Sequence, residues 1–303
     1  MRIHQYGAAS VIRDDDICRP VPGPGEVLIH VAATSFNPSD IGLRRGLLRS
    51  LLPLQLPVTL GADVAGTVTA AGMGVHTPAV GDRVIGRLDR GGAAAGYVTA
   101  AAGTLAAAPA AIPLAHAAAI PVAGLTAWQA VFEHAAITPG QRVLVNGAGG
   151  GIGGFAVQLA KRAGAYVIAT ASPRSTGMTH RNGADQVVDY TATPLAEALD
   201  EPVDVILNLV VLSAQRAATL LSTMRPGGVA VSATPVSPPA GTATTVVHFV
   251  ARNDTGHLAA LVKLIDIGAV RVNISACRPL TDLASVHRDA ESGRTHGKII
   301  LVP

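Results

Sequence analysis

The residues with the clearest chemical potential form a run of glycines between an apolar segment and a helical pattern. Residues 143–146 (VLVN) lead directly into Gly147, Ala148, Gly149, Gly150, Gly151 and Ile152. Glycines at such a junction expose backbone N–H groups at a helix N-terminus and let the main chain approach a pyrophosphate. The run therefore predicts an anion-binding turn, and a glycine-rich loop that merely reverses the chain is the alternative.

The context of this turn favours a dinucleotide site, because a glycine motif alone is weak. Apolar residues recur at helical spacing from Ile152 to Ala163, and a second apolar segment begins at Tyr166. Ser172 and Arg174 follow that second segment, and the next acidic residue is Asp185. A basic residue here accommodates the 2′-phosphate of NADPH, whereas an acidic one would bind the ribose of NADH. The predicted cofactor is NADPH, although Arg174 as an ordinary loop cation is the alternative.

Other ligand classes find little support. Cys18 and Cys277 lie far apart and none of the ten histidines has zinc-ligand spacing, so we expect no metal site and a reducing compartment. The 23 basic residues are dispersed, with few aromatics among them, which argues against nucleic acid. The alanine-rich stretch 93–119 is broken by prolines, and the first residues lack a secretory pattern, so we expect no membrane segment and a cytoplasmic location.

The elements that position these residues fall into two patterns. Up to about residue 101, short apolar runs separated by Pro and Gly indicate a β-rich unit with strands at 26–32, 63–70 and 83–86. From residue 117 helical patches alternate with apolar strands, which is typical of βαβ units on a parallel sheet. We expect those strands at 142–146, 166–171, 186–189, 203–209 and 229–233, then a helix at 257–267 and a final strand at 298–302. The predicted fold class is α/β, with a Rossmann-type doubly wound parallel sheet plus a smaller β-rich domain.

Several separated stretches resemble the medium-chain dehydrogenase/reductase superfamily, in its zinc-independent quinone oxidoreductase-like branch. They are residues 22–32 (PGPGEVLIHVA), 36–40 (FNPSD), 61–67 (GADVAGT), 80–85 (VGDRVI), 125–131 (LTAWQAV), 146–161, 183–190 (GADQVVDY) and 297–302 (GKIILV). The resemblance implies a GroES-like substrate domain, residues 1–116 and 256–303, around a Rossmann-type NADPH-binding domain, residues 117–255. It also implies an active site in the cleft between the two domains.

The resemblance assigns roles to further residues. Asn37 matches the polar residue at the nicotinamide and substrate end of the site, and Thr126 matches a contact on the nicotinamide side. Tyr190 matches an aromatic residue near the adenosine 2′-phosphate, and Arg294 a further cofactor contact. Residues 247–250, with Phe249 and Val250, fall where the family passes backbone beside the nicotinamide; simple packing there is the alternative.

The chain departs from the zinc-dependent members of that superfamily. They would show a Cys ligand near Asn37 and a Gly-His-Glu triplet where this sequence has Gly61-Ala62-Asp63. The chain also departs from members of the superfamily in general. Its segment 207–211 (LNLVV) stands where they commonly carry a glycine-containing turn after the fourth strand of the cofactor domain. Without these glycines we expect the nicotinamide pocket to differ in shape from that of other members.

Without zinc to polarise a carbonyl, hydride acceptors that delocalise charge are favoured, so the expected substrate is a quinone or an α,β-unsaturated carbonyl. Asn37 would donate its amide N–H to the acceptor oxygen, while no Tyr, His or Lys is evident as a general acid, which leaves water as the proton source. An enoyl reductase acting on a thioester or polyketide intermediate, and a structural or regulatory NADPH-binding protein without turnover, are alternatives. By analogy with the family we also expect a homodimer.

Overall fold

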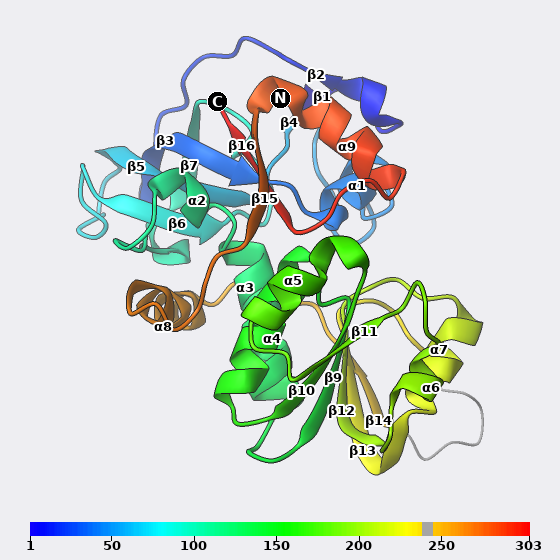
Figure 1. Cartoon of the computed structure of the whole chain (residues 1–303). Helices are drawn as coiled ribbons and strands as arrows, with labels where there is room; N and C mark the ends of the chain where they lie inside the picture. The colour runs from blue at the N-terminus through cyan, green and yellow to red at the C-terminus, as the bar shows by residue number, and fades with distance from the viewer. Residues whose placement is uncertain (238–244) are drawn as a thin grey trace. The chain divides into compact units, whose positions relative to one another are not determined.

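The computed structural model describes residues 1–237 and 245–303, and the chain divides into two compact units. The first combines Met1–Val122 with Asn253–Pro303, and the second is the continuous segment Ala123–Arg252. Both are visible in Figure 1, where the colour gradient shows that blue and red ends of the chain belong to the same unit. Each unit is described by itself.

The continuous unit is built on a parallel sheet with the strand order β11-β10-β9-β12-β13-β14. Numbered from β9 this order is 3-2-1-4-5-6, which is the order of a dinucleotide-binding doubly wound sheet. The strands are β9 (Arg142–Asn146), β10 (Tyr166–Ala171), β11 (Gln186–Asp189), β12 (Val203–Asn208), β13 (Met224–Ser232) and β14 (Thr245–His248). The connecting helices are α4 (Gly151–Arg162), α5 (Pro173–Arg181), α6 (Leu195–Ala198) and α7 (Ala214–Leu221). Before the sheet come α3 (Pro121–Trp128) and a π-helix (Gln129–His134).

Apolar side chains on both faces explain why these segments form central strands. Leu144, Ile168 and Ile206 are fully buried in one cluster with Leu220 and Leu221 of α7. A central parallel strand is covered by helices on both sides, so nearly every position is apolar. The predicted α/β class and the doubly wound parallel sheet are confirmed.

Two strands of this sheet differ from the sequence-based expectation. β13 begins at Met224 instead of residue 229, because the turn-forming residues Pro226, Gly227 and Gly228 are accommodated in an irregular pairing with β12. β14 was not expected as a strand, but residues 245–248 pair in parallel with β13. Short strands at the edge of a sheet carry a weak periodic signal, which explains why the pattern did not reveal it.

The discontinuous unit contains two further sheets. The larger has the order β15-β16-β3-β5-β6-β8, with β7 also paired to β3. Its strands are β3 (Glu26–Ser35), β5 (Asp63–Ala71), β6 (Arg83–Arg87), β7 (Tyr97–Ala101), β8 (Leu105–Ala107), β15 (Ile274–Pro279) and β16 (Lys298–Val302). The smaller contains β2 (Ile12–Arg13), β1 (Arg2–Ile3) and β4 (Val58–Thr59). Helices α1 (Pro38–Arg44), α2 (Leu114–Ala117), α8 (Thr255–Asp266) and α9 (Leu283–Glu291) complete it, with the 3₁₀ turns Ala9–Val11, Ala102–Thr104 and Leu280–Asp282.

The C-terminal segment is an integral part of the β-rich unit. β16 pairs antiparallel with β3, and Leu301 and Ile299 share one apolar cluster with Ile3 and Phe36. The predicted final strand at 298–302 is confirmed and the predicted helix at 257–267 corresponds to α8, whereas β15 and α9 had not been predicted. Their sequences mix polar and apolar residues because one face of each is exposed, so the apolar signal is diluted.

The buried Arg44 ties α1 to the C-terminal helix α9. Its guanidinium is fully buried, donates to the carbonyl of Gly7 at 2.7 Å and to Nδ1 of His287 at 3.2 Å, and pairs with Glu291. Burial, followed by the nearby Arg44 charge, lowers the pKa of His287 to about 4, so its Nδ1 stays an acceptor at neutral pH. The segment that begins with Asn37 is therefore held in place by residues more than 240 positions away.

Candidate functional site

The glycine turn between β9 and α4 is a cradle that side chains would fill. Gly147 has φ 92°, in the left-handed region that favours glycine. A Cβ on Gly149 would lie 2.3 Å from Ser175 Oγ, and one on Gly153 would lie 2.2 Å from the carbonyl oxygen of Gly147. The sequence has glycine here because both the backbone angle and the close approach require it.

Free amides line this cradle at the start of α4. The first helical bond runs from Gly154 N to Gly150 O, so the N–H groups of Gly151, Ile152 and Gly153 precede it and have no acceptor within the helix. Together with the helix dipole, such amides bind an anionic group. The open cradle and the donors fit a dinucleotide pyrophosphate.

A second helix start, that of α5, follows β10. Ser172 is its N-cap, and Arg174 is exposed in its first turn. Within residues 1–237 and 245–303, Arg174 forms no ion pair, so its guanidinium is available to a phosphate. Tyr190, 61% exposed, directly follows β11 and donates its backbone N–H to Ala171 O at 3.3 Å. Ser172, Arg174 and Tyr190 thus lie together at the carboxyl ends of β10 and β11.

A network of amide and hydroxyl side chains at the same edge was missed by the sequence analysis. Thr170 Oγ1 accepts from Gly147 N at 3.0 Å and donates to Asn146 Oδ1 at 2.9 Å. Asn146 Nδ2 donates to Asn208 Oδ1 at 2.9 Å, and Asn208 Nδ2 reaches Ser232 Oγ at 2.9 Å. The carboxyl ends of four strands are therefore locked together beneath the glycine turn. A polar residue at the end of each apolar strand was the available signal.

The departure at residues 207–211 has a visible consequence at this edge. The side chain of Val210 lies against the turn, since a Cβ on Gly147 would come within 2.6 Å of Val210 Cγ1. Val211 beside it is 85% exposed. Two valines, Val210 and Val211, therefore form an apolar rim beside the glycine turn.

The segment that carries Phe249 and Val250 is fastened to the π-helix. The buried side chain of Gln129 accepts from Arg252 N at 2.9 Å and donates to Arg252 O at 3.0 Å, as a paired strand would. The Phe249 ring is buried against His134, with centroids 4.4 Å apart, whereas Val250 is exposed. Thr126 is buried one turn before Gln129 on α3. The side chains of Phe249 and Thr126 are thus buried, whereas that of Val250 is exposed.

Asn37 lies in a buried polar cluster of the β-rich unit whose other members, Asp63 and Lys298, were not predicted from the sequence. Its amide Nδ2 donates to Asp63 Oδ2 at 2.8 Å, and its Oδ1 accepts from Lys298 Nζ at 2.9 Å. Lys298 also donates to Asp63 Oδ2 at 3.2 Å and to the carbonyl of Phe36 at 3.3 Å. The exposed fractions of Asn37, Asp63 and Lys298 are 4%, 0% and 3%. The sequence feature that could have revealed this cluster is a charged residue, Asp63 or Lys298, at the first position of an otherwise apolar strand.

Asp40, in the first turn of α1, completes the surroundings of Asn37. Its Oδ2 accepts from the backbone N–H of Asn37 at 2.9 Å and so caps the helix. Burial, above all, raises the pKa of Asp40 to about 7; the nearby Asp63 charge raises it further, while the hydrogen bond from Asn37 and the Lys298 charge oppose the shift. The carboxyl of Asp40 therefore changes its charge near neutral pH.

Arg294 belongs to a different unit from the glycine turn and the other predicted cofactor-binding residues. It follows α9 in the β-rich unit and its guanidinium pairs with Asp289 Oδ1 at 2.8 Å. The pair is solvent-exposed, so its contribution to stability is small.

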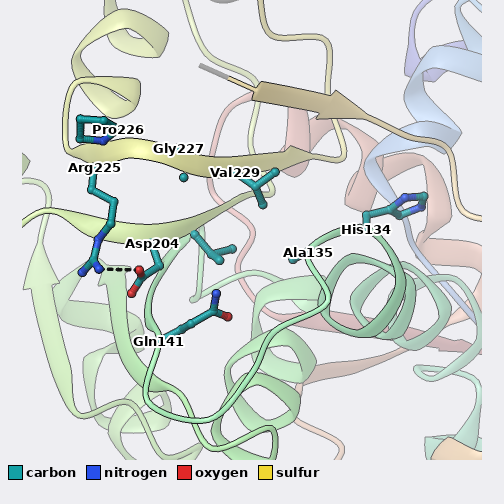
Figure 2. A pocket seen from close by; sticks show the side chains of 10 residues that line it. His134, Ala135, Gln141, Asp204, Arg225, Pro226, Gly227 and Val229 are labelled. Atoms are coloured by element: carbon teal, nitrogen blue, oxygen red, sulfur yellow. Dashed lines mark ion pairs between the residues drawn. The ribbon is translucent and has the colours of Figure 1, made fainter. Parts of the chain in front are cut away.

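A cavity of about 230 Å³ lies near the amino ends of strands β9 and β12, whereas the glycine turn follows the carboxyl end of β9. Figure 2 shows the residues that line the cavity. Its lining includes Gln141 and Asp204, near the amino ends of β9 and β12, and Arg225, which pairs with Asp204 at 2.8 Å. Ligands of doubly wound sheets bind at the carboxyl ends of the strands, so this cavity is separate from the candidate cofactor site.

No group of three or more His, Cys, Asp or Glu side chains in residues 1–237 and 245–303 is arranged to hold a metal ion. No helix in the same residues is long and apolar enough to cross a membrane.

Comparison with known proteins adds independent findings. Residues 23–121 match the family described as Alcohol dehydrogenase GroES-like domain, and residues 182–301 match the family described as Zinc-binding dehydrogenase. A chloroplastic quinone-oxidoreductase homolog of Spinacia oleracea is 38% identical over 203 residues, which are 65% of this chain and 61% of that protein. The matched region is thus about three fifths of the curated relative.

Solved structures match along the whole chain. Escherichia coli quinone oxidoreductase, solved in complex with NADPH, has a TM-score of 0.89 and 27% identity, with 100% of this chain and 99% of that chain covered. The CurK enoyl reductase has a TM-score of 0.85 and 25% identity, with 99% and 98% covered.

The parallel sheet with its glycine turn and the GroES-like unit define a two-unit dehydrogenase fold, and the chain belongs to the medium-chain dehydrogenase/reductase superfamily. Both the curated relatives and the solved structures place it more narrowly, in the quinone oxidoreductase-like branch. The resemblance seen in the sequence is confirmed.

Proposed function

We propose that this protein is an NADPH-dependent oxidoreductase that reduces a quinone or another α,β-unsaturated carbonyl without a zinc ion. The observation that carries the proposal is the glycine cradle with its free amides at the start of α4. At the next helix start it is followed by Ser172 and by Arg174, which forms no ion pair with any described residue. Similarity to quinone oxidoreductases, one of them solved with NADPH, supports the same assignment.

The residues of the continuous unit would hold NADPH in three groups. The backbone of residues 147–152 binds the pyrophosphate, Ser172, Arg174 and Tyr190 lie at the edge proposed for the 2′-phosphate, and Thr126 with residues 249–250 is proposed for the nicotinamide end. When bound, NADPH supplies a hydride. The proposed substrate domain, predicted from the sequence as residues 1–116 and 256–303, lies within the β-rich unit and would contribute Asn37 and, as a further cofactor contact, Arg294.

Asn37 is the proposed donor to the substrate. Hydride addition to a quinone or enone leaves a negative charge on oxygen, and an amide N–H stabilises that charge. The proton that completes the reduction is proposed to come from water, because the ammonium of Lys298 is almost completely buried and all three of its hydrogens have acceptors.

Steady-state kinetics of Asn37→Ala tests this assignment. We expect kcat with a quinone to fall about 10-fold or more, from the loss of one transition-state hydrogen bond, while the Kd of NADPH stays within about twofold. Unchanged turnover would remove Asn37 from the reaction.

An enoyl reductase is the second candidate function, and the similarity to the CurK enoyl reductase favours it specifically. NADPH oxidation with a panel of quinones, small enones and enoyl thioesters separates the two. Preference for a quinone or small enone supports the first proposal, preference for a thioester supports the second, and absence of turnover with all three would leave a non-catalytic NADPH-binding protein.

Two properties beyond the reaction complete the proposal. Both cysteines, Cys18 and Cys277, are exposed and unpaired, which suits a reducing compartment such as the cytoplasm. By analogy with its family we propose a homodimer formed through an edge of the parallel sheet.

A further inference from the structure

Opposite charges on its two sides determine the orientation of the Asn37 amide. The ammonium of Lys298 lies 2.9 Å from Oδ1, and the carboxylate of Asp63 lies 2.8 Å from Nδ2. If the amide were turned over, its oxygen would face the carboxylate and its NH₂ group would face the ammonium. The charges therefore permit one of the two orientations and exclude the other.

This orientation leaves one amide hydrogen weakly bound. Nδ2 carries two hydrogens, and the one not donated to Asp63 faces the carbonyl of Ser35 at 3.5 Å, which is the limit of a hydrogen bond. The other groups of the cluster have closer partners: Asp63 Oδ1 accepts from Val122 N at 2.7 Å, and Asp63 Oδ2 accepts from Ser35 Oγ, Asn37 and Lys298. The second hydrogen of Asn37 is thus the donor that can be given to another acceptor at least cost.

We propose that Lys298 and Asp63 are positioning residues for the reduction, which orient the Asn37 amide and keep its second hydrogen available to the substrate oxygen. This inference rests on the proposed function. Lys298 acts a second time through charge, since an ammonium at Oδ1 polarises the amide and makes its N–H groups better donors to a developing oxyanion. Neither residue is assigned a contact with the substrate, because the three hydrogens of the Lys298 ammonium and both oxygens of the Asp63 carboxylate already have partners.

The test relies on the different response of stability and turnover when both charges are removed. Loss of one member of a buried ion pair strands its partner, whereas replacement of both members by neutral side chains of similar shape is far better tolerated. We therefore compare Lys298→Met, Asp63→Asn and the double variant Asp63→Asn/Lys298→Met. Lys263→Met, an exposed lysine on α8, is the matched control.

The readouts are the thermal midpoint Tm, the Kd of NADPH, and kcat and KM with a quinone from the panel above. If the residues position Asn37, the double variant recovers a Tm close to that of the wild type, but its kcat stays at least 10-fold below the wild type with the Kd of NADPH unchanged. When the same double substitution is added to Asn37→Ala, kcat should fall by less than a further twofold, because the effect of the two residues on turnover depends on that amide. The Lys263→Met control keeps the kcat of the wild type.

A purely structural role gives the opposite pattern, in which kcat follows Tm and the double variant regains both; that result overturns the inference while the proposed function stands. An effect of full size in the Asn37→Ala background overturns it too. Wild-type protein that oxidises no NADPH with any acceptor overturns the proposed function, and the inference falls with it. The double variant carries no stranded charge, so the decision does not depend on either single variant folding.

Discussion

Arg174 is the side chain on which the choice between the two nicotinamide cofactors depends. It is exposed in the first turn of α5 and forms no ion pair with any residue that the structure describes, so a phosphate need not displace an existing partner. A charge-assisted hydrogen bond of this kind contributes about 1.5–3 kcal/mol, which corresponds to roughly 10- to 150-fold in affinity.

Substitution of this residue gives a first prediction. Arg174→Ala should raise the KM of NADPH about 10-fold and leave the KM of NADH within about twofold, since only NADPH carries the 2′-phosphate. Steady-state kinetics with both cofactors measures the effect, and Arg181→Ala, which removes an exposed cation from the end of the same helix, is the control. An equal change for both cofactors would show that Arg174 contacts something other than the 2′-phosphate.

Asp40 links stability to pH. Its pKa is about 7 in the folded protein, against an ordinary value of 3.8, so the folded state holds this proton between about pH 4 and 7 while the unfolded state has released it. Stability from this group is therefore fully present below about pH 4, falls as the pH rises through 7, and is constant above that.

The Asp40→Asn variant tests this dependence. Asn retains an oxygen that can accept from the backbone N–H of Asn37 but cannot ionise. Denaturant unfolding at pH 5 and pH 8 should show that the wild type, relative to Asp40→Asn, loses on the order of a few kcal/mol between the two values. Because His287 titrates in the opposite sense below pH 6.5, the comparison must be made between the variants at each pH. Parallel curves for the two proteins would contradict the shifted pKa.

At the scale of the elements, the π-helix Gln129–His134 holds the segment that follows β14 in place. Gln129 pairs with both backbone groups of Arg252, and Arg252 in turn forms two bonds to Glu133 at 2.7 and 2.8 Å. The segment after β14 is thus attached to a helix instead of to another strand. An extra residue in a helical turn redirects the side chains that follow it, and such turns are frequent at functional sites.

Gln129→Leu should therefore disturb the segment that carries Phe249 and Val250. Two part-buried backbone groups of Arg252 would lose their hydrogen bonds to Gln129, which costs about 1–2 kcal/mol, and the KM of NADPH should rise several-fold. Gln129→Glu keeps an acceptor for Arg252 N and should have an intermediate effect. The exposed Gln215→Leu on α7 is the control. A fall in Tm with an unchanged KM would separate this segment from cofactor binding.

The strands and helices differ in how well the sequence predicted them. β9, β10 and β11 were predicted with the bounds that the structure has. For the interior strands β9 and β10 the reason is that strands covered on both faces are apolar at nearly every position. The short edge strand β14 and the amphipathic α9 escaped prediction because their apolar signals are weak. In the candidate site, the glycine turn was found from local spacing, whereas Lys298 and Asp63 were not, since 235 positions separate them and only tertiary pairing joins them.

At the scale of the whole molecule, the outer edge of β14 is a candidate for assembly. It is the last strand of the described six-stranded sheet, and Val246 and Val247 on it are only partly buried. An unpaired strand edge is a template for pairing with a second chain. We expect light scattering coupled to size exclusion to give twice the chain mass of 30.6 kDa.

A charged edge should abolish that pairing. Val247→Lys should shift the measured mass to that of one chain, because lysine on an edge strand opposes pairing. Tyr166→Lys, a change at an exposed position on the interior strand β10, should leave the mass unchanged. If Val247→Lys retains the doubled mass, the dimer uses another surface; if the wild type has the mass of one chain, the dimer proposal is wrong.

The β-rich unit is formed by both ends of the sequence, so during translation it cannot be completed until the C-terminal segment has been synthesised. The parallel sheet is one continuous stretch and can form as soon as it emerges, whereas residues 1–122 must wait for residues 253–303. Until then the carboxylate of Asp63 lacks its ammonium and Arg44 lacks its glutamate. Nascent chains halted before α9 should therefore resist protease at 123–252 and be cleaved within 1–122, which makes the second half of translation the vulnerable period for this protein.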